Sequence, residues 1–485
     1  MPTTIFISAG EASGEHYGAL LIAALKKQLA AVGASASFFG MGGERMAAEG
    51  LECVVRSEEM AVMGLTEVVR HLPRIWREFR KLKQAIRERQ PSVAMLIDFP
   101  EIHFRLAKQL HRMGVPVIFF VSPQLWAWKK KRIRLVQKYI DKMLVIFPFE
   151  EAFYRQRGIE AEFVGHPLAE LPLPAISRAE FAAAIGLDPA KTWIGLLPGS
   201  RPKEIRDHLP TMLLAARGLA SLKGTGLKGT GLNGMGLKGT GLKGMGLKGM
   251  GLKGMGFSPY VNQEESMRAL APEGKAYRTS QYAYQTPEKT LSAAKAPAHC
   301  DSSMYGLKPV PFMAGDLEFI VPLAPTLNEV QRDEVRRLVA AHGAGLTLRL
   351  VEDARAALMH ARASVVASGT ATVEAALIGN PFVVVYRVSA LTYAIAKRVV
   401  KVPHVAMVNL IAGKRIVPEL IQSDFTAANI VQQIAPLLAD GPQRQSMMEE
   451  LARIRGLLVR QSEGGASDRV AAVTLETIGF EVSQV

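Results

Sequence analysis

The stretch that decides the fold is Thr4–Glu15, with the sequence TIFISAGEASGE. Its first half, Thr4–Ser8, is a short apolar run of the kind that forms a buried strand. Gly10 and Gly14 then permit a tight turn, and a helical pattern follows over His16–Leu29. The sequence therefore predicts a strand–turn–helix unit whose backbone N–H groups a ligand can approach closely.

Similar apolar runs recur along both halves of the chain. In the first half they lie at 4–8, 94–97, 115–121 and 143–147; in the second at 193–197, 317–321, 347–350, 363–367 and 382–386. Near-continuous apolar strands that alternate with helices are typical of parallel sheets covered on both faces. We expect two Rossmann-like domains, at 1–170 and 175–455, joined by the proline-rich 167–174 and followed by a helical segment at 456–485. Ligands of such sheets bind beyond the carboxyl ends of the strands.

The middle of the chain interrupts this alternation. Residues 222–256 are seven copies of a five-residue unit such as LKGTG, and two glycines per unit disfavour helix and strand. We expect 219–315 to be a disordered, low-complexity insertion in the second domain. It carries +7 of the formal net charge of +15. The insertion is interpreted either as an expanded repeat tolerated in a surface loop or as an electrostatic tether to lipid or nucleic acid.

Composition excludes several classes of protein. Apolar residues make up 48% of the chain, which is too many for a wholly disordered protein. The two cysteines, Cys53 and Cys300, cannot build a disulfide framework or a multi-cysteine zinc site. No uncharged apolar stretch reaches about 18 residues, so we expect neither a transmembrane helix nor a signal peptide. The positive net charge favours an anionic partner.

Two carboxylates follow strands of the first domain. Glu11 stands in the first turn, and Asp98, in LIDFPE at 96–101, ends another apolar strand. A carboxylate at a strand end suits a general base that faces a cleft. Alternatively, Asp98 caps the helix expected near residue 104, and the first turn is purely structural. In the first turn, which contains Glu11, we also expect Gly10, Ser13 and Gly14 to contact a substrate.

Two further segments of the first domain combine large apolar residues with cations. Trp126 lies in SPQLWAWKKKR at 122–132, where cations suit a phosphate and indoles suit a sugar or acyl group. The alternative is a solvated, basic helix start. Residues 61–82 mix large apolar side chains with five cations, as an interfacial membrane segment does. The alternative there is an ordinary amphipathic helix.

The second domain offers two turns that suit a phosphate. Ser200 and Arg201 end LLPGSR at 196–201, and an arginine binds phosphate oxygens through paired N–H groups. Residues 368–371 place small and hydroxyl side chains at a helix start, where Glu374 could bond ribose hydroxyls or merely complement the helix dipole. These four residues are Ser368, Gly369, Thr370 and Ala371. The chain has no P-loop pattern and no paired ligand spacing for a metal.

Nine motifs, taken in order, resemble the lipid-A-disaccharide synthase family. They are AGEASGE at 9–15, AVMGLTEV at 61–68, LIDFPE at 96–101, SPQLWAWKKKR at 122–132, PFE at 148–150, GHP at 165–167, LLPGSR at 196–201, ASGTATVEA at 367–375 and NLIAGKRIVPELIQ at 409–422. The resemblance covers 1–218 and 316–480. It implies a GT-B glycosyltransferase whose two Rossmann-like domains face a cleft. The implied reaction joins UDP-2,3-diacylglucosamine to 2,3-diacylglucosamine 1-phosphate, giving the β-1′,6-linked lipid A disaccharide 1-phosphate and UDP.

The resemblance also implies roles for residues. Asp98 matches the base that takes the acceptor 6-hydroxyl proton, Glu11 matches a functionally important glutamate, and Arg201 with Ser200 matches the site that faces the UDP diphosphate. The turn at 368–371 with Glu374 matches the nucleotide-binding turn, and Asn409 begins a motif near the cleft. The family implies no metal or other cofactor. It implies a peripheral protein at the anionic, cytoplasmic face of the inner membrane, and a homodimer is left open.

The chain departs from the family pattern at two places, and rival functions remain to be weighed. Glu15 stands where the family usually has Asp, and Pro100–His103 (PEIH) where it usually has Pro-Asp-Phe-Asn. The rivals are another GT-B UDP-N-acetylglucosamine transferase or 2-epimerase, a nucleic-acid-binding protein, and a catalytically dead lipid-binding scaffold. Nearly half of the charge lies in the glycine-rich insertion, which argues against nucleic acid. The intact Glu11, Asp98 and Arg201 argue against the scaffold.

Overall fold

The structure is a computed structural model, which describes residues 3–57, 65–127, 130–222, 317–399, 402–459 and 464–480. All of these belong to one compact unit of the chain. Helix α10 (Pro202–Ala220) extends two residues into the expected insertion at 219–315. From residue 223 onward that insertion lies outside the described residues. In the described part of the chain, no helix is long and apolar enough to cross a membrane.

The first sheet has seven parallel strands in the order β3-β2-β1-β4-β5-β6-β7. The strands are β1 (Thr3–Ala9), β2 (Ala36–Gly42), β3 (Leu51–Arg56), β4 (Val93–Ile97), β5 (Val117–Phe120), β6 (Lys142–Val145) and β7 (Ala161–Phe163). The helices between them are α1 (Ala12–Ala31), α2 (Glu44–Ala48), α4 (Leu65–Arg89), α5 (Pro100–Arg112), α6 (Ile133–Tyr139) and α7 (Pro148–Arg155). Side chains of β1 enter both faces: Ile5 and Ile7 join one core, and Phe6 joins the other.

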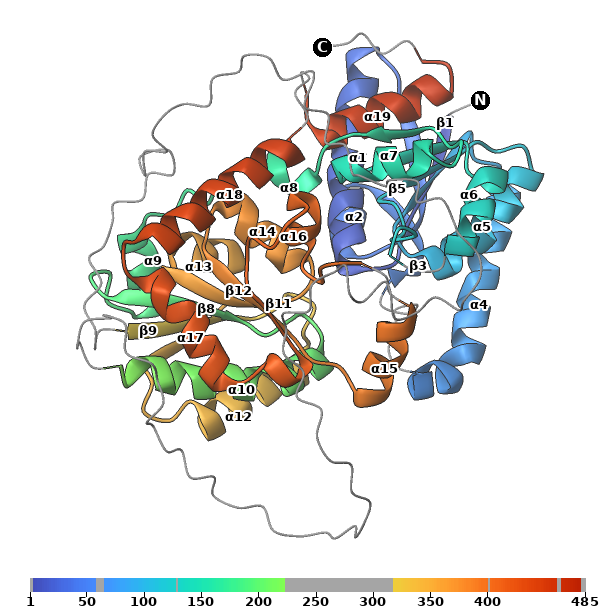
Figure 1. The fold of residues 1–485 in the computed structure, drawn as a ribbon. Coiled ribbons are helices and arrows are strands. Elements are labelled where there is room, and N and C mark those ends of the chain that lie inside the picture. The colour runs from blue at the N-terminus through green and yellow to red at the C-terminus, as the bar shows by residue number, and fades with distance from the viewer. Residues whose placement is uncertain are drawn as a thin grey trace, which may run out of the picture. The chain divides into compact units, whose positions relative to one another are not determined.

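The second sheet has six parallel strands in the order β10-β9-β8-β11-β12-β13. The strands are β8 (Thr192–Leu197), β9 (Leu317–Pro322), β10 (Leu348–Val351), β11 (Ala363–Ala367), β12 (Phe382–Tyr386) and β13 (Glu419–Ile421). The helices of this half are α9 (Arg178–Ile185), α10, α12 (Glu329–His342), α13 (Ala354–His360), α14 (Thr370–Ile378), α15 (Ala390–Val399), α16 (Met407–Ala412) and α17 (Ala427–Leu438). Several strands of each sheet are labelled in Figure 1.

All nine predicted apolar runs contain a strand, and four further strands were not predicted. Strand β2 (ASFFGMG) carries two glycines, and β3 (LECVVR) interrupts its apolar residues with charges. Strands β7 and β13 have three residues each. All four lie at or next to a sheet edge, where a strand needs less apolar surface than it does in the centre.

In each sheet, the order in which successive strands are added changes direction at one point. In the first sheet β1 lies between β2 and β4; in the second, β8 lies between β9 and β11. A crevice opens beyond the carboxyl ends of the strands where the order reverses, and ligands of doubly wound sheets bind there. We call the loops after β1 and β4 the first switch point, and those after β8 and β11 the second switch point.

The C-terminal helices return the chain to the first domain. Helix α18 (Pro442–Leu458) ends where the Leu458 carbonyl accepts a hydrogen bond from the N–H of His166 (2.9 Å). Helix α19 (Ala466–Thr477) packs against α1, as Figure 1 shows. The Gln28 amide donates to the Asp468 carbonyl (2.7 Å). The expected C-terminal helical segment at 456–485 thus begins inside α18 and includes α19.

Candidate functional site

Asp98 follows β4 directly, at the first switch point. Asp98 and Phe99 both have left-handed backbones, with φ of 51° and 52°. For residues with a side chain this conformation is less favourable by about 1–2 kcal/mol each. Helix α5 begins at Pro100, and Phe99, not Asp98, is its N-cap residue. The alternative that Asp98 serves as a helix cap is therefore wrong, and its carboxylate is available for other contacts.

Burial and charge make the Asp98 carboxyl unusually basic. Its pKa is raised to about 7, first by burial and then by the negative charges of Glu11 and Glu101. A hydrogen bond from the Phe99 N–H and the positive charge of Arg201 oppose this rise in pKa. A carboxylate with a pKa near neutrality can accept a proton from a substrate and release it again.

The loop after β1 brings Glu11 toward the second switch point. Glu11 is the N-cap residue of α1, but its side chain makes no capping hydrogen bond. Instead, its Oε2 lies 3.6 Å from Nη2 of Arg201. Gly10 leaves room for the Phe99 ring, because a Cβ at Gly10 would come within 2.2 Å of that ring. Ser13 is partly buried and Gly14 is buried, and a Cβ at Gly14 would lie 3.5 Å from the carbonyl oxygen of Ile97, so this turn lies beside the Asp98 loop.

The loop after β8 is shaped by a glycine. Gly199 has a φ of 117°, and a Cβ there would lie 2.5 Å from Oε2 of Glu204. That oxygen accepts a hydrogen bond from the Ser200 N–H (3.3 Å), and Glu204 also contacts Nη1 of Arg201 (3.4 Å). The Arg201 side chain, 41% exposed, therefore lies between Glu204 and Glu11. The pair with Glu11 is open to solvent and can be exchanged for an anionic ligand at little cost in stability, whereas Glu204 is partly buried, with 17% of its side chain exposed.

The loop after β11 leads into the N-terminus of α14. Gly369 is its N-cap residue, with a φ of 153°, and both Gly369 and Thr370 are exposed. The N–H groups of the first turn of a helix lack partners within the helix, so this end can bind an anion. Ser368 and Ala371 are partly exposed beside them. Burial raises the pKa of Glu374 in the next turn, and the charges of Arg355 and Arg45 partly oppose that rise.

The structure adds residues to this region that sequence reasoning missed. Tyr17 is buried, and its pKa is raised by burial and by the charges of Glu374 and Asp98, so it lies near both carboxylates. His16 Nδ1 lies 3.1 Å from Nη1 of Arg45. His16 and Tyr17 share a helix face with Ser13, which could have indicated them. Arg45 belongs to none of the quoted motifs, so the sequence offered no signal for it.

Trp126 is held by a buried carboxyl group. Its indole N–H donates to Oε1 of Glu150 (3.1 Å), and the N–H of Phe147 donates to Oε2 (3.2 Å). Burial raises the pKa of Glu150 to about 8. Trp128 and Lys129 lie outside the described residues. The indole nitrogen, the one polar atom of the Trp126 side chain, is already bonded to Glu150. The substrate contact predicted for Trp126 stays a prediction.

Asn409 lies in the interior and has no exposed surface. Its Oδ1 accepts the N–H groups of Ile416 (2.8 Å) and Val417 (3.0 Å). Its Nδ2 donates to the Val417 carbonyl (3.0 Å) and to Oε1 of Glu419 (2.8 Å). The structure therefore does not bring Asn409 to the exposed ends of the strands, and any effect on a ligand would be indirect.

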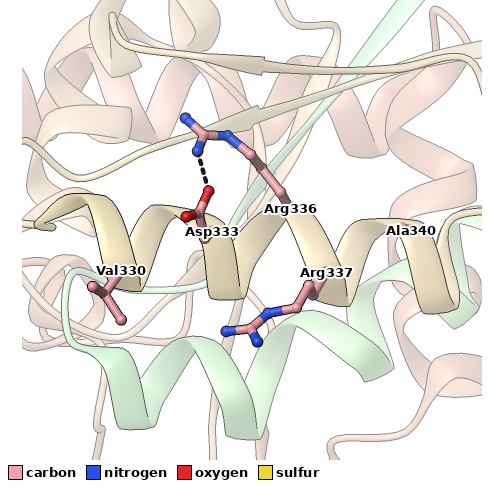
Figure 2. A pocket seen from close by; sticks show the side chains of 5 residues that line it. All are labelled: Val330, Asp333, Arg336, Arg337 and Ala340. Carbon is pink, nitrogen blue, oxygen red and sulfur yellow. Dashed lines mark hydrogen bonds and ion pairs between the residues drawn. The ribbon is translucent and has the colours of Figure 1, made fainter.

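A separate surface pocket lies on α12, away from these loops. It is lined by Val330, Asp333, Arg336, Arg337 and Ala340, and Arg336 pairs with Asp333 (Figure 2). None of the predicted site residues lines it. Among the described residues, no group of three or more His, Cys, Asp or Glu side chains is placed to hold a metal ion.

Comparisons with known proteins agree with this architecture. A family model described as lipid-A-disaccharide synthetase matches residues 5–225 and 313–471 and leaves 226–312 unmatched. The chain is 51% identical to a lipid-A-disaccharide synthase of Acidobacterium capsulatum, over 94% of this chain and 91% of the relative. It is 40% identical to a lipid-A-disaccharide synthase of Koribacter versatilis, over 97% of both chains.

A solved structure shares the fold at low sequence identity. It is a putative UDP-N-acetylglucosamine 2-epimerase from Listeria monocytogenes, with a TM-score of 0.53 and 11% identity over 99% of this chain and 98% of that chain. Together with the two parallel sheets and their order, this likeness confirms the predicted GT-B architecture of two Rossmann-like domains.

Proposed function

The chain belongs to the lipid-A-disaccharide synthetase family, and we propose that it transfers 2,3-diacylglucosamine from UDP to the 6-hydroxyl of 2,3-diacylglucosamine 1-phosphate. The products are the β-1′,6-linked lipid A disaccharide 1-phosphate and UDP. One observation carries the proposal: the ion pair between Glu11 and Arg201 joins the two switch points beside Asp98. A base and a cation on opposite sides of one reacting centre are what glycosyl transfer needs.

The second switch point supplies the donor site in this proposal. The N-terminus of α14, at Gly369 and Thr370, offers N–H groups to the UDP diphosphate. Arg201 contacts the same diphosphate when it exchanges its exposed carboxylate partners for phosphate oxygens. In this proposal Glu374, one turn further along α14, bonds the ribose hydroxyls of the donor.

Asp98 supplies the base. It takes the proton from the acceptor 6-hydroxyl while that oxygen attacks the anomeric carbon of the donor. The new C–O bond forms as the bond from the anomeric carbon to the UDP oxygen breaks, and its electron pair leaves with UDP. Arg201 stabilises the negative charge that develops on the diphosphate. Attack opposite the leaving group inverts the anomeric carbon, which gives the β-linkage.

Helix α4 supplies the contact with lipid. Trp76 is 50% exposed, and the guanidinium of Arg80 lies 5.5 Å from its ring centroid. Lys83 lies 5.7 Å from the ring centroid of Phe79. An exposed indole flanked by cations suits the boundary between an apolar layer and anionic headgroups. Residues 61–64 of the predicted interfacial segment lie outside the described residues. A homodimer stays a prediction from the sequence.

The test is a product assay with the purified full chain. We expect the acylated donor and acceptor to give the disaccharide 1-phosphate and stoichiometric UDP, detected by mass spectrometry. The matched pair without fatty acyl chains, UDP-N-acetylglucosamine with glucosamine 1-phosphate, should react far more slowly. Equal rates with the non-acylated pair would indicate another GT-B transferase. Isomerisation of UDP-N-acetylglucosamine in the absence of an acceptor would indicate a 2-epimerase.

A further inference from the structure

The side chain of His103 forms a hydrogen bond with the backbone of the loop that contains Asp98. Its side chain is completely buried on α5, in the stretch PEIH that departs from the family pattern. Its Nδ1 lies 2.5 Å from the carbonyl oxygen of Asp98. Its Nε2 lies 2.9 Å from Oγ of Ser8, on β1. The ring therefore connects the two strands that define the first switch point.

The contacts determine which ring nitrogen carries the proton. A carbonyl oxygen can only accept, so Nδ1 of His103 must be the donor to Asp98. Burial lowers the pKa of His103 to about 4, so the ring is neutral at pH 7. Nε2 then has no proton and accepts the hydroxyl hydrogen of Ser8. The ring is thus a one-way link: Ser8 donates to His103, and His103 donates to Asp98.

The link acts where two consecutive residues have an unfavourable backbone conformation. Asp98 and Phe99 are both left-handed, and no glycine relieves the strain. Such a conformation persists only where surrounding contacts impose it. The His103 ring lies edge-on to Phe99 and to Phe119, with centroids 5.8 and 6.0 Å away. The ring hydrogen-bonds to the Asp98 carbonyl, and two backbone bonds also hold the pair: the Asp98 N–H donates to the Phe120 carbonyl (3.0 Å) and the His103 N–H to the Phe99 carbonyl (3.2 Å).

We propose that His103 is the positioning residue of the base: its Nδ1–H fixes the carbonyl of Asp98 and thereby aims the carboxylate at the acceptor hydroxyl. The inference rests on the proposed function, in which Asp98 is the base. The side-chain amide of an asparagine can donate from nearly the same place as Nδ1 of a histidine, so an asparagine at this position would keep the donor.

Two substitutions of similar shape test separately the contacts made by Nδ1 and by Nε2 of His103. Asn places its amide nitrogen near Nδ1 of a histidine, whereas Gln places its own near Nε2. His103→Asn should retain most of the turnover, because it still donates to Asp98. His103→Gln keeps the contact with Ser8 but loses the contact with Asp98. Since small misplacements of a catalytic group are costly, we expect kcat to fall by at least about 30-fold with both KM values changed less than about twofold.

A pH profile separates positioning from a change in basicity. If His103→Gln acted by shifting the pKa of Asp98, its kcat would recover at a higher or lower pH. Misplacement predicts a loss that persists from pH 6 to pH 9. Ser8→Ala is the matched control, because it removes the other end of the link and leaves the Asp98 contact. UDP affinity, measured on every variant, reports whether the second domain is intact.

The outcomes are distinct. A low kcat for His103→Gln beside near-normal His103→Asn and Ser8→Ala supports the proposal. Equal activity of the Asn and Gln variants overturns it, and so does an equal loss in both. A loss in Ser8→Ala as large as in the Gln variant also overturns it. Asp98→Asn, assayed in parallel, tests the proposed function: full activity there would remove the base itself, whatever the His103 variants show.

Discussion

Asp98→Asn is expected to make the protein more stable above pH 7. The folded pKa of Asp98 is about 7, against an ordinary value of 3.8 for an aspartate side chain. Between these two values the folded state keeps a proton that the unfolded state has lost, so this carboxyl lowers stability as the pH rises through that interval. The penalty is complete above the folded pKa and is absent below about pH 4. An amide at this position never ionises and avoids the penalty.

The magnitude follows from the size of the pKa shift. A rise of about three units corresponds to about 4 kcal/mol at most. The amide oxygen of asparagine can still accept the Phe99 N–H, but this bond is weaker than the bond to the carboxylate, which offsets about 1 kcal/mol of that gain. We therefore expect Asp98→Asn to raise the free energy of unfolding by about 2–3 kcal/mol at pH 8 and by less than about 1 kcal/mol at pH 4.

The assay is urea unfolding of both proteins at intervals from pH 4 to pH 9. Glu52→Gln is the control of opposite sign, because a hydrogen bond to Arg89 holds the pKa of Glu52 below its usual value. That variant should lose a little stability as the pH rises above the unfolded pKa. If Asp98→Asn is no more stable than the original chain at pH 8, then Asp98 does not have a raised pKa and is a poorer candidate for the base.

Four further substitutions, one of them a control, test the remaining parts of the site. Arg201→Lys should leave the unfolding midpoint nearly unchanged, because the arginine side chain is 41% exposed and lysine keeps the positive charge beside Glu11 and Glu204, but lower kcat by about 100-fold or more through loss of paired phosphate contacts. Gly10→Ala should lower kcat, because the new Cβ would lie 2.2 Å from the Phe99 ring, whereas Gly14→Ala, with its nearest atom at 3.5 Å, should be tolerated. Equal activity of the two alanine variants would contradict this packing argument. Asn409→Leu should lower the free energy of unfolding by about 3 kcal/mol or more, because it removes the partner of the buried Val417 N–H and carbonyl and of the partly buried Ile416 N–H; an unchanged urea midpoint would show that water replaces its bonds.

Much of the fold could be predicted because its signal is local. Central parallel strands are buried on both faces, so runs such as Thr4–Ser8 and Ala363–Ala367 stand out from their surroundings. The carboxyl ends of those strands then indicated the loops at Glu11, Asp98 and Arg201. The structure brings these three loops together, and it does so through the order of the strands, which neighbouring residues do not encode.

The missed features depend on contacts between distant residues. The left-handed backbone of Asp98 has no marker in LIDFPE, since nothing there is a glycine. The ring of His103 reaches Ser8 across 95 residues. Asn409 begins the motif at 409–422 and was predicted to bind substrate, yet its side-chain amide is hydrogen-bonded to the backbone of Ile416 and Val417. In each case tertiary packing decides which residues contact one another, and therefore which role each residue has.

The central claim is that Asp98 performs the chemical step while the second domain holds the donor. The most direct measurement compares Asp98→Asn with the original chain, in one protein preparation each, for UDP affinity and for single-turnover formation of the disaccharide 1-phosphate. The account predicts unchanged UDP affinity and a rate lower by at least about 100-fold, the usual contribution of a general base. An unchanged single-turnover rate would contradict it.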